Sequence, residues 1–245
     1  MTGRDDGRRA VLYVVATPIG NLEDLSPRAA RILREVAVVA AEDTRRSATL
    51  LRHVGSTATM MVADEHHEQR AAQKIAQHLA AGQSVALVSD AGTPGISDPG
   101  FLLVRACVKA DIPVECLPGP SALIPAIVVS GLSCDRFHFE GFLPHKKGRQ
   151  TRLKYLASLE NSFVLYESPH RLVKCLDELI VACTATRQAC ICRELSKRHE
   201  EIRRGSLDDL RTYYTENADK VRGEIVIVVD RIPDTKGQAN RYSEE

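Results

Sequence analysis

Short apolar runs alternate with amphipathic segments through the first half of the chain. Apolar runs of this length, bounded by glycine, proline and polar residues, are typical of buried strands, and apolar positions three or four apart are typical of helices. The runs predict strands at 10–16, 36–40, 58–62, 85–90 and 113–117. The amphipathic segments predict helices at 27–34, 68–80 and 101–110, and a further helix that follows the polar segment 42–46 and ends at Arg52.

The strongest helix-breaking sequence of the chain is Pro118-Gly119-Pro120-Ser121-Ala122, and we expect a domain boundary there. The predicted domains cover 10–118 and 119–232, and the polar ends, 1–9 and 233–245, are expected to be disordered. The second half predicts strands at 136–140, 162–166, 188–192, 199–204 and 224–230. Its helices are expected at 121–130, after the basic segment 145–154, at 170–182 and at 206–214.

Alternating strands and helices, with strands that are apolar throughout, indicate a parallel-rich α/β sheet. The sequence therefore predicts two α/β domains. In such sheets ligands bind beyond the carboxyl ends of strands, and clefts between domains are a preferred place for small ligands.

The stretch 85–100 fits a ligand loop best. An apolar run ends at Asp90, and three glycines, two prolines and Asp98 follow before the next helix. Most loops between a strand and a helix need two to six residues, and this one is longer. Glycine lets the backbone approach a ligand closely, and a carboxylate at a strand end can accept hydrogen bonds from ribose hydroxyls. The simpler alternative is a tight turn with no ligand.

Polar residues also follow the other predicted strands. Each such loop alone could be a capped helix start, as Asp43 before Thr44 shows. Besides the 90–100 loop, the loops with polar residues are 17–25, 42–46, 118–122, 142–149, 167–171 and 193–197. Repetition of the pattern at successive strand ends favours a composite ligand cleft between the two domains.

Composition excludes several classes of protein. The 245 residues are 44% hydrophobic and 27% charged, which is ordinary for a globular protein. No apolar run reaches the roughly 18 residues of a membrane span, and the charged segment 1–9 is not followed by the apolar core of a signal peptide, so we expect a cytoplasmic protein. The seven cysteines form no CxxC pair and are expected to be reduced thiols.

The familiar cofactor and metal motifs are missing. The sequence contains neither G-x-G-x-x-G after a strand nor a Walker A motif. His66-His67-Glu68 lacks the second half of a zinc motif, so no metal is expected. Net charge is only +1 and aromatic residues are 4% of the chain, so polyanion binding needs a local patch and not a stacking platform. The densest basic stretch contains Lys146, Lys147, Arg149, Arg152 and Lys154.

The motifs together resemble those of the tetrapyrrole methylase superfamily, and more closely its ribosomal-RNA branch, the small-subunit rRNA (cytidine-2′-O)-methyltransferase I family. The resemblance covers about residues 10–231. In the first half it is carried by 15–22 with Asp24-Leu25, 42–45, 89–94, 97–100 and 117–122. In the second half it is carried by 139–144, 166–171, 192–197 and 222–224.

This resemblance implies a homodimer that binds S-adenosylmethionine in a cleft between two α/β domains and 2′-O-methylates a cytidine of 16S rRNA in the small ribosomal subunit. The implied cofactor residues in the first domain are Pro18, Ile19, Asp90, Gly92, Ile96, Ser121 and Ala122. In the second domain they are Tyr166, Arg193, Gly223 and Glu224.

A ribose hydroxyl becomes a good nucleophile only when a base removes its proton. The candidates at strand ends are Asp43, Glu167, Glu194, His170 and Lys197, and the sequence does not choose between them. Phosphate contacts are expected from Arg45, Lys146, Lys147, Arg149, Arg171 and Lys197. Two alternatives remain open: a corrin or porphyrinogen methylase, and a non-catalytic RNA-binding or assembly factor.

Overall fold

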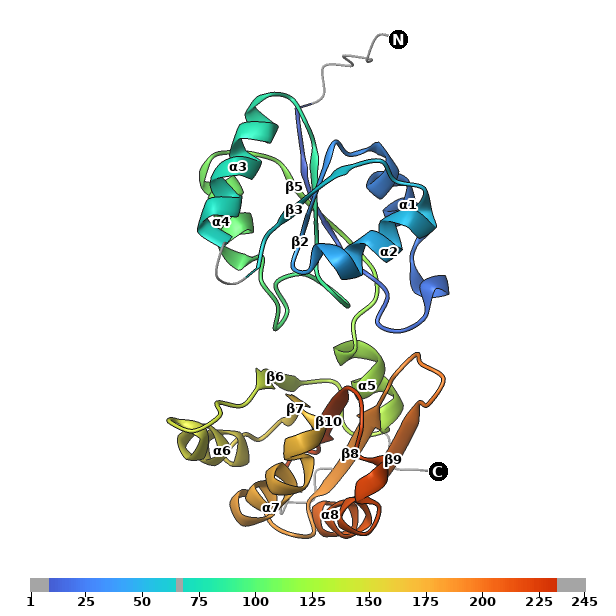
Figure 1. Ribbon diagram of the computed structural model, residues 1–245. Helices are drawn as coiled ribbons and strands as arrows, with labels where there is room; N and C mark the ends of the chain where they lie inside the picture. Colours follow the sequence, from blue (N-terminus) through green and yellow to red (C-terminus); the bar gives the residue numbers. More distant parts are fainter. Residues whose placement is uncertain (1–8, 65–67, 233–245) are drawn as a thin grey trace. The chain divides into compact units, whose positions relative to one another are not determined.

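A computed structural model describes residues 9–64 and 68–232, which form two compact units divided in sequence after Ala122 (Figure 1). The predicted tails lie outside the described residues, apart from Arg9, and so does the His66-His67 pair. The division falls directly after the Pro-Gly-Pro-Ser-Ala stretch that the sequence marks as a boundary.

The first unit is a five-stranded sheet in the order β3-β2-β4-β1-β5, in which every neighbouring pair is parallel. Its strands are β1 (Leu12–Val15), β2 (Val38–Ala41), β3 (Thr59–Val62), β4 (Val85–Val88) and β5 (Val114–Leu117). Its helices are η1 (Leu22–Asp24), α1 (Pro27–Glu35), α2 (Thr44–Val54), α3 (Glu68–Ala80) and α4 (Phe101–Lys109). The expected parallel α/β sheet is confirmed.

The helices cover both faces of this sheet, with α1 and α2 on one face and α3 and α4 on the other (Figure 1). The strands are buried on both faces because side chains of alternating positions enter two different clusters: Val39 and Val88 pack toward α1 and α2, and Val38 and Leu87 pack toward α3 and α4. This explains why β2 and β4 are apolar at every position.

The helix starts follow local rules. Ser26 accepts a hydrogen bond from the amide of Ala29 at 3.1 Å, and Pro27 occupies the first turn of α1. Asp43 caps α2 by accepting from the amide of Arg45 at 2.8 Å. These caps set where each loop ends and therefore which polar residues remain at the sheet edge.

The second unit has a mixed sheet in the order β6-β7-β10-β8-β9. Its strands are β6 (Phe137–Phe142), β7 (Ser162–Glu167), β8 (Gln188–Arg193), β9 (Glu201–Ser206) and β10 (Ile225–Val229). Its helices are α5 (Leu123–Ser130), α6 (Arg149–Ala157), η2 (Pro169–Arg171), α7 (Leu172–Ala182), α8 (Leu207–Glu216) and η3 (Ala218–Lys220). Only β6 and β7 are parallel, and the other pairs are antiparallel, so the parallel-rich prediction holds for the first unit alone.

Strand β6 continues past its predicted end at 140. A bulge between Phe139 and Gly141, where Gly141 has φ +70°, shifts the register and keeps Phe142 paired with Tyr166. Helices α6, α7 and α8 bury one face of the sheet around Leu156, Leu176 and Tyr214. None of the helices in the described residues is long and apolar enough to cross a membrane.

Candidate functional site

The first unit has a topological switch point at β4. The chain leaves β1 and β2 toward one face of the sheet, whereas it leaves β4, which lies between them, toward the other face. Diverging connections open a crevice at the carboxyl edge of the strands, and ligands of open α/β sheets bind there. The loop after β4 is the long 89–100 segment that the sequence singled out.

Hydrogen bonds hold the loops after β1, β4 and β5 together. The backbones of Thr17 and Gly92 exchange two hydrogen bonds, of 2.8 and 2.9 Å. The hydroxyl of Thr17 donates to the carbonyl of Ser89 at 3.1 Å, and that of Thr93 donates to the carbonyl of Pro120 at 3.1 Å. The structure therefore gathers the segments that carry Pro18 and Ile19, Asp90 and Gly92, and Ser121 and Ala122. Ile96 lies in the same loop with an exposed side chain.

Two glycines shape these loops. Gly92 has φ +84°, a backbone conformation that favours glycine, although a Cβ there would lie at an ordinary contact distance of 3.5 Å from Cγ2 of Ile19. A Cβ at Gly119 would lie 2.8 Å from the Cβ of Ala16, which is closer than side-chain carbons pack. Bare backbone thus lines the switch point, as recognition of a ligand through main-chain amides and carbonyls requires.

Asp90 ties the loop after β4 to the loop after β2. Its Oδ1 accepts from the amide of Asp43 at 3.1 Å, and its Oδ2 pairs with the guanidinium of Arg46 at 2.9 Å. Each carboxylate oxygen has a second lone pair, so Asp90 keeps acceptor capacity for a ligand hydroxyl. Burial, together with the nearby charge of Asp90, raises the pKa of Glu42.

Asp43 is engaged by its neighbour. The Arg45 guanidinium donates to both oxygens of Asp43, at 3.1 and 2.8 Å, and these bonds together with the Arg45 amide lower the pKa of Asp43 to about 2. A carboxylate with so low a pKa is a weak proton acceptor at neutral pH. Arg45 itself is exposed but has this counter-ion.

In the second unit, strand register brings three predicted segments to one sheet edge. Ile225, at the start of β10, pairs with Glu167 at the end of β7 and with Arg193 at the end of β8. Gly223 and Glu224 directly precede this row. Tyr166 packs edge-on against Phe139 and Phe142, with ring centroids 5.1 and 5.6 Å apart.

Glu194, Lys197 and Glu224 form a closed group at this edge. The Lys197 ammonium lies 2.7 Å from Oε1 of Glu194 and 2.7 Å from Oε2 of Glu224, and the amide of Glu224 donates to Glu194 at 2.9 Å. Burial opposes the charged forms, but these contacts outweigh it, lowering the pKa of Glu194 and raising that of Lys197. Lys197 is thus held protonated and Glu194 binds a proton only weakly, so neither is well suited to be the base.

The side chain of Arg193 also has interaction partners within the second unit. It pairs with Glu201 at 3.0 Å and donates to the carbonyl of Arg222 at 3.4 Å, while the hydroxyl of Tyr214 donates to Glu201 at 2.8 Å. Its Nε is buried and has no partner in the described part of the chain.

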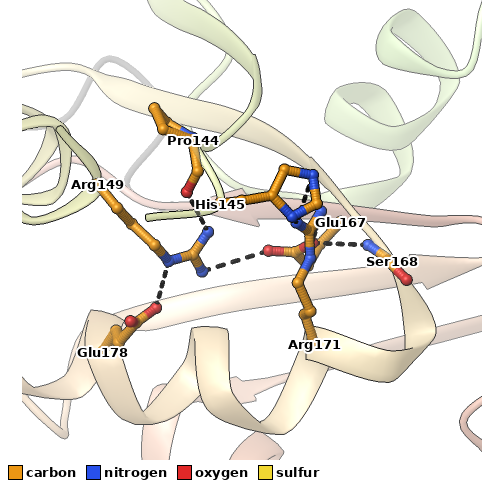
Figure 2. A network of polar contacts seen from close by, with 7 residues as sticks. All are labelled: Pro144, His145, Arg149, Glu167, Ser168, Arg171 and Glu178. Carbon is orange, nitrogen blue, oxygen red and sulfur yellow. Dashed lines mark hydrogen bonds and ion pairs between the residues drawn. The ribbon is translucent and has the colours of Figure 1, made fainter. Parts of the chain in front are cut away.

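Figure 2 shows the network around Glu167, whose carboxylate lies between two arginines. Oε1 accepts from Nε of Arg171 at 2.8 Å and from the amide of Ser168 at 2.7 Å. Oε2 lies 3.4 Å from Nη2 of Arg149, whose Nε donates to Glu178 at 2.7 Å. With its side chain 1% exposed and its oxygens so engaged, Glu167 is poorly suited to remove a proton from a substrate.

The basic stretch does not form the single exposed patch that the sequence predicts. Arg149, which the sequence assigns to RNA binding, is buried between Glu167 and Glu178, so the expectation that it lies in an exposed loop is wrong. The charge density misled the prediction because α6 begins at Arg149 and turns this residue into the core. Arg152 pairs with Glu140. Lys146 and Lys147 are exposed in the turn between β6 and α6.

Sequence reasoning did not assign roles to Glu42, Arg46, His145 or Glu178. The sequence gives a weak indication of a role for Glu42, because it is the first polar residue after the buried strand β2. Glu178 and Arg46 lie on helices far along the chain from their partners, and no sequence pattern marks such pairs. His170, the remaining candidate base, lies exposed in η2.

Within residues 9–64 and 68–232, no cluster of three or more histidine, cysteine or acidic side chains has the geometry to hold a metal ion. All seven cysteines are free thiols, as the sequence predicts. The sulfur atoms of Cys190 and Cys192 lie 3.8 Å apart in β8.

Comparison with known proteins first defines the class. The family model described as Tetrapyrrole (Corrin/Porphyrin) Methylases matches residues 11–211. The fold resembles that of uroporphyrin-III C-methyltransferase from Thermus thermophilus, solved with S-adenosyl homocysteine, with a TM-score of 0.63, 19% identity, and coverage of 90% of this chain and 97% of that one. The two units are therefore those of a tetrapyrrole methylase.

Sequence relatives narrow this class. The chain is 48% identical to the ribosomal RNA small subunit methyltransferase I of Xylella fastidiosa over 91% of its own length and 82% of the relative's. It is 48% identical to the protein of the same name from Synechocystis, over 89% of this chain and 78% of the relative. The chain belongs to the ribosomal RNA small subunit methyltransferase I family, and the resemblance drawn from its motifs is confirmed.

Proposed function

We propose that the protein transfers a methyl group from S-adenosylmethionine to the 2′-oxygen of a cytidine in the 16S rRNA of the small ribosomal subunit. The observation that carries this proposal is the 48% identity to a ribosomal RNA small subunit methyltransferase I over 91% of the chain. The switch point of the first unit supports a nucleoside-like cofactor. We further propose that the enzyme acts in the cytoplasm, where it would meet a ribosomal substrate, and that it is a homodimer, as the family resemblance implies.

The residues at the switch point fit S-adenosylmethionine, which supplies a methyl group already activated by its sulfonium. Backbone around Gly92, Ser121 and Ala122 comes close enough to bind the nucleoside through main-chain groups. Asp90 has lone pairs left for the ribose hydroxyls, and Pro18, Ile19 and Ile96 supply apolar surface. In the second unit we assign cofactor contacts to Tyr166, Arg193, Gly223 and Glu224.

In this reaction the 2′-oxygen bonds to the methyl carbon, the carbon–sulfur bond breaks, and the hydroxyl proton leaves to a base. Alignment of the oxygen with the methyl group supplies much of the acceleration, and a positioned base adds roughly 10²–10⁴-fold. Asp43, Glu167, Glu194 and Lys197 are each bound to an opposite charge. Among the strand-end carboxylates, Glu42 has an environment that favours proton binding, so we add it to the candidates.

For the RNA we assign the phosphate contacts to exposed cations near these edges. Lys146 and Lys147 are exposed, and Arg45 is exposed beside its partner Asp43. Arg171, which the sequence also suggests, is bound by Glu167. A cation neutralised by a carboxylate gains less from a phosphate than a free one, so the two lysines carry most of the proposed affinity.

The test is methyl transfer from labelled S-adenosylmethionine to small ribosomal subunits that lack the modification, followed by nuclease digestion and mass mapping. We expect one labelled nucleoside, 2′-O-methylcytidine. Label on a base, or none with RNA but transfer to a porphyrinogen or corrin, would overturn the proposal. Tight subunit binding without any transfer would instead indicate an assembly factor.

A further inference from the structure

The turn between β6 and α6, residues 144–149, is fastened at both ends. At its start, Nη1 of Arg171 lies 2.5 Å from Nδ1 of His145, and Nη1 of Arg149 donates to the carbonyl of Pro144 at 3.3 Å. At its end, the amide of Arg149 bonds back to the carbonyl of Lys146 at 3.3 Å. The exposed Lys146 and Lys147 lie between these fixed points.

Arg149 and Arg171, which hold the turn, both bind the buried carboxylate of Glu167. Figure 2 shows Arg149 and Arg171 approaching Glu167 from two sides, one toward each oxygen. Arg171 reaches it from η2 and Arg149 from α6, so Glu167 links the end of β7 to both flanks of the turn. A carboxylate that binds two guanidinium groups fixes their orientation as well as their charge.

The network is charge-balanced internally. Arg149 and Arg171 are matched by Glu167 and Glu178, and three of these four side chains are less than a fifth exposed. Within the turn itself, the cations left for a ligand are therefore Lys146 and Lys147, which are exposed and have no ion-pair partner within the described part of the chain. Rigid support lowers the ordering cost of a binding turn and so increases its affinity.

We propose that Glu167 is a positioning residue, which through Arg149 and Arg171 holds the 144–149 turn ready to bind RNA phosphates with Lys146 and Lys147. Arg171 acts through the turn and does not itself contact phosphate. This inference rests on the proposed function, and it gives Glu167 and Arg171 roles different from base and phosphate ligand.

The test combines Arg171→Gln and Arg171→Lys with the double variant Lys146→Ala/Lys147→Ala. These changes leave the buried Arg149–Glu178 pair intact. Glu167→Gln is not used, because it removes a carboxylate that binds the buried guanidinium of Arg149 and could prevent folding. Arg211→Gln is the matched control, since Arg211 pairs with Asp177 at 3.0 Å elsewhere in the same unit. Affinity for small-subunit rRNA is measured over a salt series, and amide hydrogen exchange is measured on the free protein.

We expect the lysine double variant to reduce the salt slope by roughly 1.4–1.8, the value for two lost phosphate contacts. In the Arg171→Gln background, the loss of affinity caused by the lysine double variant should be at least about threefold smaller than in the wild type. The reason is that mutations of residues in one network have non-additive effects. Arg171→Lys should behave like Arg171→Gln because an ammonium cannot hold Glu167 and His145 together. Both should speed exchange of the Arg149 amide, which bonds to the carbonyl of Lys146, and Arg211→Gln should not.

Two results would overturn the inference. If the effects of Arg171→Gln and the lysine variant multiply, and Arg171→Lys retains wild-type affinity, then Arg171 is a direct phosphate ligand. Unchanged exchange of the Arg149 amide in both Arg171 variants would show that the turn does not depend on Arg171. Neither result touches the proposed function, which fails separately if the wild type does not methylate the subunit RNA.

Discussion

Gly223 lies against the carboxyl group of Glu194 with no space for a side chain. A Cβ at position 223 would come within 3.0 Å of three Glu194 atoms, and Gly223 has φ +82°. The same carboxylate binds Lys197 and the amide of Glu224. A glycine in the segment before β10 thus permits the ion-paired group at the edge of the second sheet.

Gly223→Ala should therefore destabilise the protein by about 2.5–5 kcal/mol, from ~1–2 kcal/mol for a left-handed backbone and the loss of charge-assisted hydrogen bonds worth about 1.5–3 kcal/mol. Gly131→Ala is the control, because Gly131 has φ +69° and nothing within 4 Å of a Cβ. It should cost only the backbone part. Urea unfolding of both variants measures the difference, and equal losses would mean that Glu194 moves aside freely.

Asp90→Ala should weaken S-adenosylmethionine binding about tenfold or more, since a hydrogen bond to a charged group contributes about 1.5–3 kcal/mol. Arg46→Gln separates a direct contact from a loop effect, because it removes the ion pair to Asp90 and leaves the carboxylate. Titration calorimetry should show a much smaller loss for Arg46→Gln. Equal losses would indicate that Asp90 acts only by holding the loops together.

Glu42→Gln should change the pH dependence of stability. Burial and the charge of Asp90 raise the pKa of Glu42 in the folded protein, so the folded state binds this proton more tightly than the unfolded state. Its contribution is fully present below the ordinary pKa of 4.5 and is lost as the pH rises through the folded pKa. Relative to the variant, wild-type stability should decline over this interval in denaturant titrations. A constant difference at all pH values would contradict the shift.

Arg45→Ala should raise the pKa of Asp43 from about 2 toward its usual 3.8, because the strongest interaction of this carboxylate is with the Arg45 guanidinium. The rise should be incomplete, since the amide at position 45 still donates to Asp43 as the α2 cap. Carboxyl chemical shifts followed by NMR between pH 1 and 6 measure both values. Arg52→Ala, later on α2, is the control and should leave Asp43 unchanged.

The sequence by itself determined the elements and the loops. Strand β4 and the glycine-rich loop after Asp90 could be predicted because a fully buried strand must be apolar at every position, and a loop that lets backbone approach a ligand needs glycine. The caps at Ser26 and Asp43 are likewise local, since each bonds an amide two or three residues ahead. The motifs in these loops were also enough to indicate the family.

Only the tertiary structure decided which polar side chains are available for chemistry. Arg149 stands among four other cations in sequence, yet its environment is set by Glu178 on α7 and Glu167 on β7. Glu167 and Glu194 resemble candidate bases until their partners are known. The pKa of Glu42 is raised by burial and then by the charge of Asp90, which the pairing of β2 with β4 brings near it. Charge state and exposure depend on neighbours distant in sequence, because electrostatic interactions and burial act through space and not along the chain.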